Sequence, residues 1–429
     1  MAKSRAGAPS LKTEVVAGIT TFLTMSYIVV VNPGILSTAG TGMPFSGVMT
    51  ATVLICFLMT LMMGLYADLP FAVAPGMGIN AYFTFTVILG QQVPWPIALG
   101  MVFWAGILFL LISVTPVRVT IARAIPHGLR HACAAGIGLF LTFIGLKSGG
   151  FIVADPVTFV KLGPWDHRTA FMILSFGVMI VLLRRKSPFA FLAGMVGVTV
   201  VSLILGYVKP PEQLVSAPDF SSVFFKFDAL GALQWVLVPT IIVILFTDLF
   251  DSISTFIGVS QASGLLDEKG DPKNLKEGLV VDAFATLGAG IAGTSSGTAY
   301  IESSAGTEVG GRTGRTAVVT ALCFLPCFFI GPIVQMVPAY ATAPVLVLVG
   351  ALMFRSVADL KLQKLEDAVP AFLTVILIPL TFSITQGILW GFISHVALYA
   401  LAGRRKEVHS VMWGIAALSM LLLAIEYSR

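Results

Sequence analysis

Residues 289–306 read Ala289-Gly290-Ile291-Ala292-Gly293-Thr294-Ser295-Ser296-Gly297-Thr298-Ala299-Tyr300-Ile301-Glu302-Ser303-Ser304-Ala305-Gly306. This stretch lies among hydrophobic segments long enough to span a bilayer, yet its glycines, its Ser/Thr run and its single carboxylate make a poor membrane helix. Irregular backbone at membrane depth is tolerated only where protein buries it or where it lines a cavity. An ionisable residue at that depth indicates a functional site. We therefore interpret Thr294 to Glu302 as part of a binding site.

Composition indicates the class of protein around this stretch. Hydrophobic residues make up 57% of the 429 and charged residues 11%, with a mean hydropathy of +0.94. An average soluble domain has roughly 25% charged residues. The chain is therefore predicted to be an all-α polytopic membrane protein. The formal net charge of +5 does not indicate nucleic-acid binding, because the basic residues cluster in short loops.

Hydrophobic runs of about 20 residues predict fourteen transmembrane spans, seven in each half. A polar stretch at 209–228 separates the halves, and a last apolar run at 411–425 is expected to span, to lie at the interface or to pack against the bundle. The spans are placed near 14–37, 46–66, 72–89, 95–114, 131–148, 168–183, 188–207, 232–258, 276–293, 296–311, 315–337, 342–356, 368–384 and 386–402.

Basic residues agree with this number of spans and predict a cytoplasmic N-terminus. They gather at the N-terminus and after the even-numbered spans, whereas the opposite side keeps few of them, as the positive-inside rule requires. The predicted cytoplasmic set is Lys3, Arg5, Lys12, Arg118, Arg123, Arg130, Arg184, Arg185, Lys186, Lys269, Lys273, Lys276, Arg312, Arg315, Arg355, Lys361, Lys364, Arg404, Arg405 and Lys406.

A second irregular segment stands at the matching position of the first half. Residues 69–82 contain Pro70, Pro75, Gly76 and Gly78, which disfavour a helix before about Gly78. Two homologous halves of seven spans must lie in opposite orientation, and paired Gly/Pro-interrupted segments are the best sequence pointer to a transporter's central site. We therefore expect two inverted seven-span repeats, with short extended segments in spans three and ten. The alternative is that these glycines only permit close helix packing.

If both segments are extended first and helical afterwards, two half-helix N-termini meet near the middle of the membrane. Each would offer free backbone N–H groups, and the extended parts would offer further donors and acceptors. A flat, neutral solute with several polar groups would suit such a site, and so would an anion. A break at Asn32-Pro33 in span one, the repeat partner of span eight, adds Asn32 as a residue expected to line the site.

Acidic residues in the neighbouring spans narrow the choice of solute. Asp248 and Asp251 share one face of span eight, and span nine adds Asp282. A carboxylate at the centre of a span costs about 2.5–3.5 kcal/mol, so that some of these acids are expected to be protonated or hydrogen-bonded. Such a group can take a proton on one side and release it on the other. The alternative is that they only tie helices together, which is as good a reading as proton transfer for Asp282.

Other polar residues are expected to have structural roles. His395 in span fourteen is interpreted as a satisfied core histidine, and Glu308 with Arg312 as an ion pair at a helix end. No metal site and no cofactor are expected, with the proton as coupling ion. The cysteines lie in apolar segments without a neighbouring metal-ligand set and are interpreted as packing residues: Cys56, Cys133, Cys323 and Cys327.

Several motifs together resemble the nucleobase–ascorbate (nucleobase/cation symporter-2) superfamily. The segment from Thr298 to Ser303, followed by 310–314, resembles its tenth-span signature. Four further motifs resemble the AzgA-like branch, which comprises adenine, guanine and hypoxanthine permeases. They are Asn32-Pro33-Gly34, residues 74–82, Thr247-Asp248-Leu249-Phe250-Asp251-Ser252 and Gly293-Thr294-Ser295-Ser296. These motifs follow one another in the same order over nearly the whole chain.

The resemblance implies a fold of two domains, a core and a gate. The core would comprise 14–114 and 232–337 and the gate 131–207 and 342–402, with 411–425 as an extra segment. A homodimer through the gate domain is implied as well. The resemblance further implies a secondary transporter, and not an enzyme, that imports a purine base by proton symport across the cytoplasmic membrane.

The same resemblance implies roles for single residues. Glu302 would accept hydrogen bonds from the base, Asp248 would be the second acidic contact, and the backbone around Met77–Gly78 and Tyr300–Ile301 would read the purine edge. The expected binding residues are Glu302, Asp248, Met77, Gly78, Asn80, Tyr300, Ile301 and Thr298; the proton-coupling candidates are Asp248, Asp251, Glu302 and Asp282; the site-lining residues are Asn32, Pro75 and Ser252.

Two other functions fit the sequence less well. An anion exchanger on the same fold would be expected to carry a cation or a neutral residue where Glu302 is, because a carboxylate repels an anion. An intramembrane aspartyl protease needs two aspartates facing each other from separate helices, whereas Asp248 and Asp251 share one helix. Lipid and a small purine are the expected partners, with no nucleic acid.

Overall fold

The computed structural model describes residues 9–115, 125–266, 272–360 and 362–427. Of the basic residues used for the orientation, Lys3, Arg5, Arg118, Arg123, Lys269 and Lys361 lie outside these ranges. The helices and strands of the first half are α1 (Leu11–Met25), α2 (Ile28–Leu36), α3 (Phe45–Leu65), β1 (Val73–Pro75), α4 (Met77–Ala81), the π-helix η1 (Tyr82–Gly90), α5 (Trp95–Val114), α7 (His127–Ser148), β2 (Ile152–Asp155), β3 (Phe159–Leu162), α8 (His167–Arg184) and α9 (Ala190–Ile204).

The second half is also mostly helical and contains one short strand. Its elements are the 3₁₀ turns η2 (Gly231–Leu233) and η3 (Trp235–Leu237), then α10 (Val238–Ser263), α11 (Leu275–Ala292), β4 (Gly297–Ala299), α12 (Ser303–Val309), α13 (Gly314–Phe324), η4 (Leu325–Phe329), α14 (Gly331–Gln335), α15 (Ala339–Phe354), η5 (Arg355–Asp359), α16 (Leu365–Leu380), α17 (Ile384–Leu401), η6 (Arg405–Glu407) and α18 (Ser410–Tyr427).

The structure is predominantly helical, as the sequence predicts. Within the described ranges, eight helical stretches are long and apolar enough to cross a membrane. Each of the fourteen predicted spans coincides with one or more helices, but several of these are short or interrupted. The eight long stretches are Leu11–Leu36, Phe45–Leu65, Trp95–Val114, His127–Ser148, His167–Arg184, Trp235–Gln261, Ala339–Asp359 and Ile384–Leu401.

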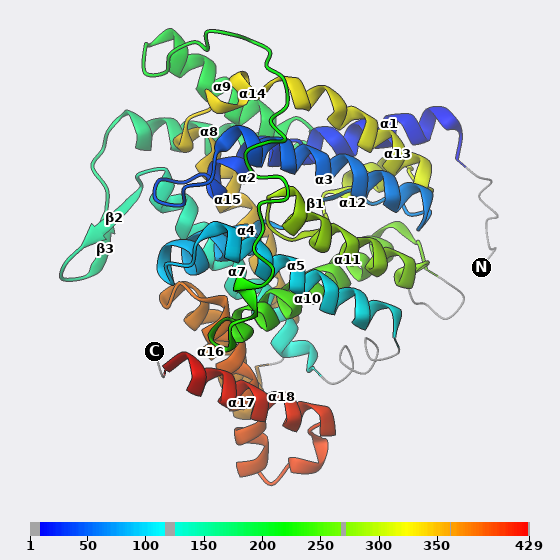
Figure 1. Ribbon diagram of the computed structural model, residues 1–429, viewed down its shortest axis with the longest axis vertical. Helices are drawn as coiled ribbons and strands as arrows, with labels where there is room; N and C mark the ends of the chain where they lie inside the picture. Colours follow the sequence, from blue (N-terminus) through cyan, green and yellow to red (C-terminus); the bar gives the residue numbers. More distant parts are fainter. Residues whose placement is uncertain (1–8, 116–124, 267–271, 361, 428–429) are drawn as a thin grey trace.

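The helices pack as two groups. The first helix group comprises α1 to α5 with α10 to α14, and the second comprises α7 to α9 with α15 to α17; the most extensive packing lies within each group. In Figure 1 the second helix group forms a band down the left side of the first. The predicted extended segments of spans three and ten are the strands β1 and β4, which lie in the first helix group.

Glycine allows the closest helix crossings in both groups. A Cβ on Gly64 of α3 would lie 2.5 Å from the carbonyl oxygen of Gly314 at the start of α13. A Cβ on Gly138 of α7 would lie 2.5 Å from the carbonyl oxygen of Gly350 of α15. Small residues at such crossings bring helix backbones into contact, which is how helices associate in lipid. These four glycines therefore serve close helix packing.

The break in span one is not at Asn32-Pro33 as predicted. The helix breaks at Ser26-Tyr27, and Pro33 lies inside α2. A proline ring clashes with the carbonyl four residues earlier, so it disturbs the turn before it and not its own position. Here Val29 N–H and Val30 N–H bond to the carbonyls three residues back, at Ser26 and Tyr27, which tightens that turn.

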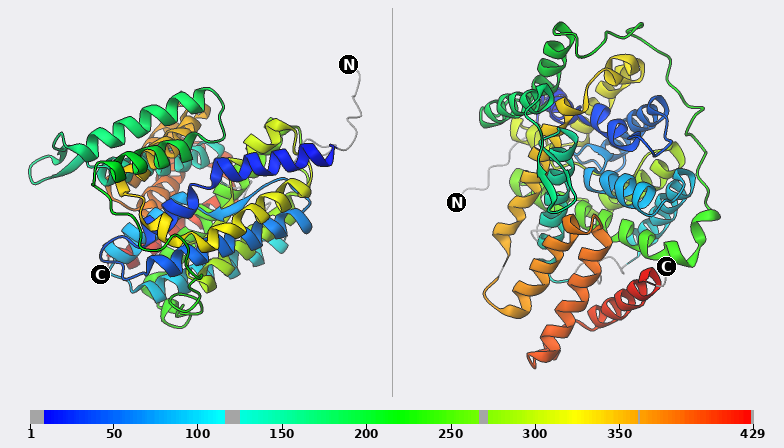
Figure 2. Two further views of the ribbon diagram at one scale, coloured as in Figure 1. Left: turned by 90° about the horizontal axis from the view of Figure 1, so that it is seen from above. Right: turned by 90° about the vertical axis from the view of Figure 1, so that its left-hand side faces the viewer.

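Two elements extend the helical body. The hairpin of β2 and β3 projects from one edge of the molecule in both Figure 1 and Figure 2. The C-terminal helix α18 includes the apolar run at 411–425, and it packs against α17 and α10. The apolar run at 411–425 is therefore helical and contacts the bundle.

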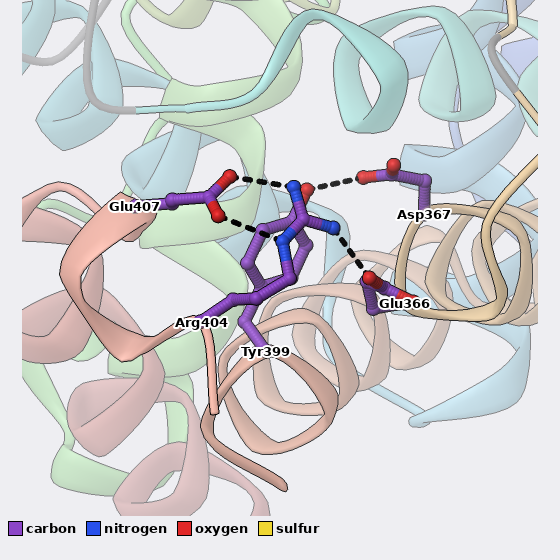
Figure 3. A network of polar contacts seen from close by, with 5 residues as sticks. All are labelled: Glu366, Asp367, Tyr399, Arg404 and Glu407. Atoms are coloured by element: carbon purple, nitrogen blue, oxygen red, sulfur yellow. Dashed lines mark hydrogen bonds and ion pairs between the residues drawn. The ribbon is translucent and has the colours of Figure 1, made fainter. Parts of the chain in front are cut away.

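A polar network ties the start of α16 to the end of α17 (Figure 3). The Arg404 guanidinium forms ion pairs with Glu366 and, at 2.5 Å, with Glu407, and it lies 4.8 Å above the centre of the Tyr399 ring. Tyr399 donates a 2.5 Å hydrogen bond to Asp367. The hydrogen bonds from Arg404 lower the pKa of Glu407. The pKa of Glu366 is lowered first by a backbone N–H and then by Arg404.

We expect Arg404→Ala to lower the thermal midpoint of the purified protein by a few degrees, on the order of 1–3 °C. The pKa values of both glutamates are lower in the folded protein than their ordinary value of 4.5. The network therefore contributes its full stabilisation of the fold above pH 4.5, and this stabilisation is lost as the pH falls below that value. Arg405→Ala, at the neighbouring exposed arginine, is the matched control. An equal thermal midpoint for Arg404→Ala and Arg405→Ala near neutral pH would contradict a stabilising role of the Arg404 network.

Candidate functional site

The two interrupted segments meet as an antiparallel pair of strands. Val73 pairs with Ala299, Ala74 with Thr298 and Pro75 with Gly297. The pairing continues at both ends, because the Gly76 N–H donates to the Ser296 carbonyl at 2.8 Å and the Tyr300 N–H to the Ala72 carbonyl at 2.9 Å. Backbone groups that would be unpaired in lipid thus satisfy one another. The sheet β1–β4 is the centre of the candidate site.

Glu302 stands where the second segment turns from strand to helix. It directly precedes α12, and its side chain is half-buried. The hydroxyl of Tyr27 donates a 2.5 Å hydrogen bond to Glu302 Oε1, and the carboxylate also interacts with its own backbone N–H. Its neighbour Ile301 is 56% exposed, so the strand-to-helix junction is open on one side.

Asp251 of α10 interacts with Glu302. The two carboxyls interact electrostatically, and Asp251 is half-buried like Glu302. Asp248, three residues earlier on α10, is fully buried and turned to α11 and β4: its Oδ2 accepts hydrogen bonds from the hydroxyls of Thr286 and Ser296, the latter at 2.6 Å. The two aspartates therefore have different surroundings, although spacing places them on one helix face.

Asp282 of α11 holds the strand β4 in place by hydrogen bonds. Its Oδ2 accepts a 3.0 Å hydrogen bond from the Ala299 N–H and a 3.4 Å bond from the Thr298 hydroxyl. Thr298 is buried and also shares a 3.0 Å hydrogen bond with Ser252 of α10. Asp282, Thr298 and Ser252 are all buried, and their hydrogen bonds hold the strand in place.

Two asparagines hold the polar run before β4. Asn80 Oδ1 accepts a hydrogen bond from Ser295, and Asn32 Nδ2 donates to Thr294 at 2.8 Å and to Thr52 at 2.6 Å. Both asparagines are fully buried. The run Thr294–Ser296 is therefore anchored side chain by side chain, to α2, α4 and α10 in turn.

The remaining candidates surround the junctions of the two strands. Met77 is buried, and Gly78 lies against Ile137 of α7, where a Cβ would come within 2.5 Å of Ile137 Cγ2. The Tyr300 hydroxyl donates a 2.5 Å hydrogen bond to the Pro75 carbonyl, which ties the two segments together beside Glu302. Gly78 is one of the points where the first helix group touches the second.

The expectation that both half-helices offer free N–H groups is wrong for α12. The N–H groups of Ser303, Ser304 and Ala305 donate to the carbonyls three residues back, at Tyr300, Ile301 and Glu302. A tight 3₁₀-type first turn uses these donors within the helix. In this segment the carboxylate of Glu302 is therefore the main polar feature.

The expected Glu308–Arg312 pair is also wrong. Helix α12 ends at Val309, because Gly310 takes a φ of +115°, so Arg312 is not one turn further along the same helix. Arg312 instead donates to the carbonyls of Thr307 and Gly311. Glu308 pairs with Lys186, between α8 and α9, at 3.3 Å.

Tyr27 is a residue of the candidate site that the sequence did not reveal. It carries a polar group inside an apolar span, and a buried Tyr hydroxyl usually needs a partner. That signal indicates that a partner exists, but it does not say that the partner lies 275 positions away. The Thr286 and Ser296 hydroxyls on Asp248 were missed for the same reason.

Comparisons with known proteins agree with this geometry. The sequence model of the permease family matches residues 12–389. The adenine permease AdeP of Escherichia coli K12 is 42% identical over 98% of this chain and 94% of its own length. The guanine/hypoxanthine permease PbuO of Bacillus subtilis 168 is 38% identical over 97% of this chain and 98% of its own length.

Among solved structures, the transmembrane domain of a cyanobacterial bicarbonate transporter, BicA, has the same fold. Its TM-score is 0.64 over 89% of this chain and 97% of that domain, at 15% sequence identity. At that identity the likeness concerns the fold alone. The relatives of high identity and the family match carry the assignment: the chain is a multi-pass membrane protein of the permease family, and it belongs to the nucleobase–ascorbate transporter superfamily, in the branch of adenine and guanine/hypoxanthine permeases.

Proposed function

We propose that this chain imports purine nucleobases across the cytoplasmic membrane by proton symport, with its N-terminus on the cytoplasmic side. The observation that carries the proposal is the half-buried Glu302 carboxylate, which lies at the open junction of the paired strands β1 and β4. A carboxylate accepts hydrogen bonds and has about four lone-pair sites. Tyr27 is the only side chain in the described ranges that donates to it, so capacity remains for the N–H groups of a base.

The acids nearby suit a proton-coupled mechanism. In the described part of the chain, no Lys, Arg or His forms an ion pair with Asp248, Asp251, Asp282 or Glu302. One oxygen each of Asp248 and Asp282 is buried without a hydrogen-bond partner there. An unpaired buried carboxylate is costly, and protonation removes its charge. We assign proton exchange to Asp251 and Glu302, because these two are half-buried and close together, and a structural role to Asp282.

The packing of the helices favours two inverted repeats. If α1–α2, α3, α5, α7, α8 and α9 correspond to α10, α11, α13, α15, α16 and α17, the most extensive contacts between these helices have counterparts. The packing of α3 on α13 matches that of α11 on α5, α1 on α13 matches α10 on α5, and α8 on α9 matches α16 on α17. Two strands that run across the membrane and are exchanged by a two-fold axis in its plane are antiparallel, as β1 and β4 are.

Transport would move the first helix group, as core, against the second, as gate. The two groups touch near both expected faces. On the cytoplasmic side Glu308 pairs with Lys186. On the outer side the Tyr82 hydroxyl and the Thr385 hydroxyl share a 2.5 Å hydrogen bond, and Thr86 donates to the Phe382 carbonyl. A movement of core against gate, with the base carried beside β1 and β4, breaks and remakes these contacts.

We expect Gly78→Ala to reduce purine uptake, because the new methyl group would collide with Ile137 of the gate. Overpacking of this kind costs about 1–3 kcal/mol, so uptake is expected to fall on the order of tenfold. The initial rate of labelled hypoxanthine uptake measures the effect. Gly34→Ala is the control, because a Cβ on Gly34 meets nothing within 4 Å. Equal rates for the two variants would refute a tight core–gate contact at Gly78.

An anion exchanger on the same fold remains the weaker candidate. The likeness to BicA concerns the fold, whereas the open junction of the strands presents a carboxylate and has a second one, Asp251, close by. Two carboxylates repel an anionic solute and favour a neutral one with N–H donors.

Competition of labelled hypoxanthine uptake tests the proposal in cells that lack their own purine permeases. The competitors are unlabelled adenine, guanine and hypoxanthine, and uracil and bicarbonate serve as controls. At least one purine should inhibit uptake. Replacing Na⁺ by choline should leave uptake unchanged. Inhibition by bicarbonate alone, or by no purine, would exclude purine transport.

A further inference from the structure

Tyr27 connects Glu302 to the second helix group. It lies in the break between α1 and α2 and is fully buried. Its hydroxyl donates to Glu302 Oε1 at 2.5 Å, and its ring packs edge-on against Phe191 at the start of α9, with ring centroids 4.9 Å apart. One side chain of the core thus touches the proposed substrate acceptor and a helix of the gate.

The bond from Tyr27 restricts what Glu302 can accept from a base. A hydrogen bond from a hydroxyl to a carboxylate is among the stronger kinds in proteins, so Tyr27 competes strongly with a base for Oε1. A base with two adjacent N–H donors needs both carboxylate oxygens at once, whereas a base with one donor needs only Oε2. The hydrogen bond from Tyr27 to Oε1 therefore disfavours binding of a base with two adjacent donors relative to a base with one.

The purines differ in this respect. Guanine presents its ring N1–H and its exocyclic 2-amino group side by side on one edge. Hypoxanthine presents only the ring N1–H on that edge, and adenine has a single exocyclic amine as its donor there. If Tyr27 donates to Oε1, the second guanine donor must share this oxygen with the Tyr27 hydroxyl, which weakens its hydrogen bond in a half-buried site.

We propose that Tyr27 is a specificity-determining residue that reserves Glu302 Oε1, so that the site favours purines with one donor on the recognised edge over guanine. The proposal rests on the proposed role of Glu302 as acceptor of the base. Phe191 holds the Tyr27 ring in place, so the gate helix α9 takes part in the discrimination between purines. Tyr27 acts on the base through Glu302 and is in this sense a positioning residue.

Equilibrium binding to the purified full chain tests this role. Labelled hypoxanthine is bound to the wild type and to Tyr27→Phe, and unlabelled guanine competes. Tyr27→Phe keeps the ring on Phe191 and removes only the hydroxyl, so the ratio of guanine to hypoxanthine dissociation constants is expected to fall on the order of tenfold. Tyr340→Phe is the matched control, since it removes the hydroxyl of another buried tyrosine, which donates to Ser202 at 3.0 Å in the gate. This control should leave the ratio unchanged.

The outcomes separate the two proposals. An unchanged ratio in Tyr27→Phe, with hypoxanthine still bound, overturns the role of Tyr27 and leaves the purine site standing. Binding of hypoxanthine by Glu302→Gln at wild-type affinity overturns the purine site itself. If Tyr27→Phe does not fold, Phe191→Leu decides, because it frees the Tyr27 ring while leaving its hydroxyl. A lowered ratio is then expected, and an unchanged one overturns the proposal.

Discussion

Glu302→Gln is expected to lower purine uptake by about 10- to 100-fold while the protein still reaches the membrane. The substitution keeps the size of the side chain but replaces one carboxylate oxygen by an NH₂ group, which donates where the base needs an acceptor. Its remaining oxygen can still accept the hydrogen bond that Tyr27 now donates to Oε1, so the strand-to-helix junction should hold. Initial uptake rates, normalised to the amount of protein in the membrane, measure the loss.

A control on the same helix separates this effect from a general loss of charge. Glu308 is exposed near the end of α12 and pairs with Lys186, away from β1 and β4. Glu308→Gln is therefore expected to retain most of the uptake. Wild-type uptake by Glu302→Gln, or an equal loss in both variants, would remove Glu302 from the proposed site.

Dissipation of the proton gradient by an uncoupler is expected to abolish accumulation of purine by the wild type. Asp251→Asn is expected to have a related effect without an uncoupler: accumulation against a gradient is lost, while exchange of labelled for unlabelled purine continues. Exchange moves no net proton, so it does not need a titrating group. The electrostatic interaction of Asp251 with Glu302, together with its half-buried position, is the reason for choosing this aspartate.

Asp282→Asn provides the contrast. Asp282 accepts the Ala299 N–H and the Thr298 hydroxyl behind β4, so its loss should weaken the strand and lower the thermal midpoint. An effect confined to stability is expected, with coupling retained in the protein that folds. Accumulation that survives both the uncoupler and Asp251→Asn would contradict proton symport.

Much of the site could be predicted because local chemistry decides it. Prolines and glycines exclude a continuous helix at 69–82 and 289–306, and the same segments form β1 and β4. Glu302 was found because a carboxylate at membrane depth is rare, and it lies at the junction of strand and helix. These are properties of residue types and of their spacing, which a sequence shows directly.

Other features depend on contacts between distant segments, which spacing does not reveal. Three-residue spacing places Asp248 and Asp251 on one helix face, yet Thr286 and Ser296 engage only the first of them. The expected pair of Glu308 and Arg312 failed because Gly310 ends the helix between them. The break in span one lies at Ser26-Tyr27 and not at Asn32-Pro33, and it is this break that brings Tyr27 to Glu302.

The most direct measurement is a structure of the full chain in lipid with bound hypoxanthine. The account predicts that the base lies beside β1 and β4, with a ring N–H within about 3 Å of a Glu302 carboxylate oxygen. Tyr27 should remain on Oε1. A base bound elsewhere, or one whose donors face away from Glu302, would contradict the central claim.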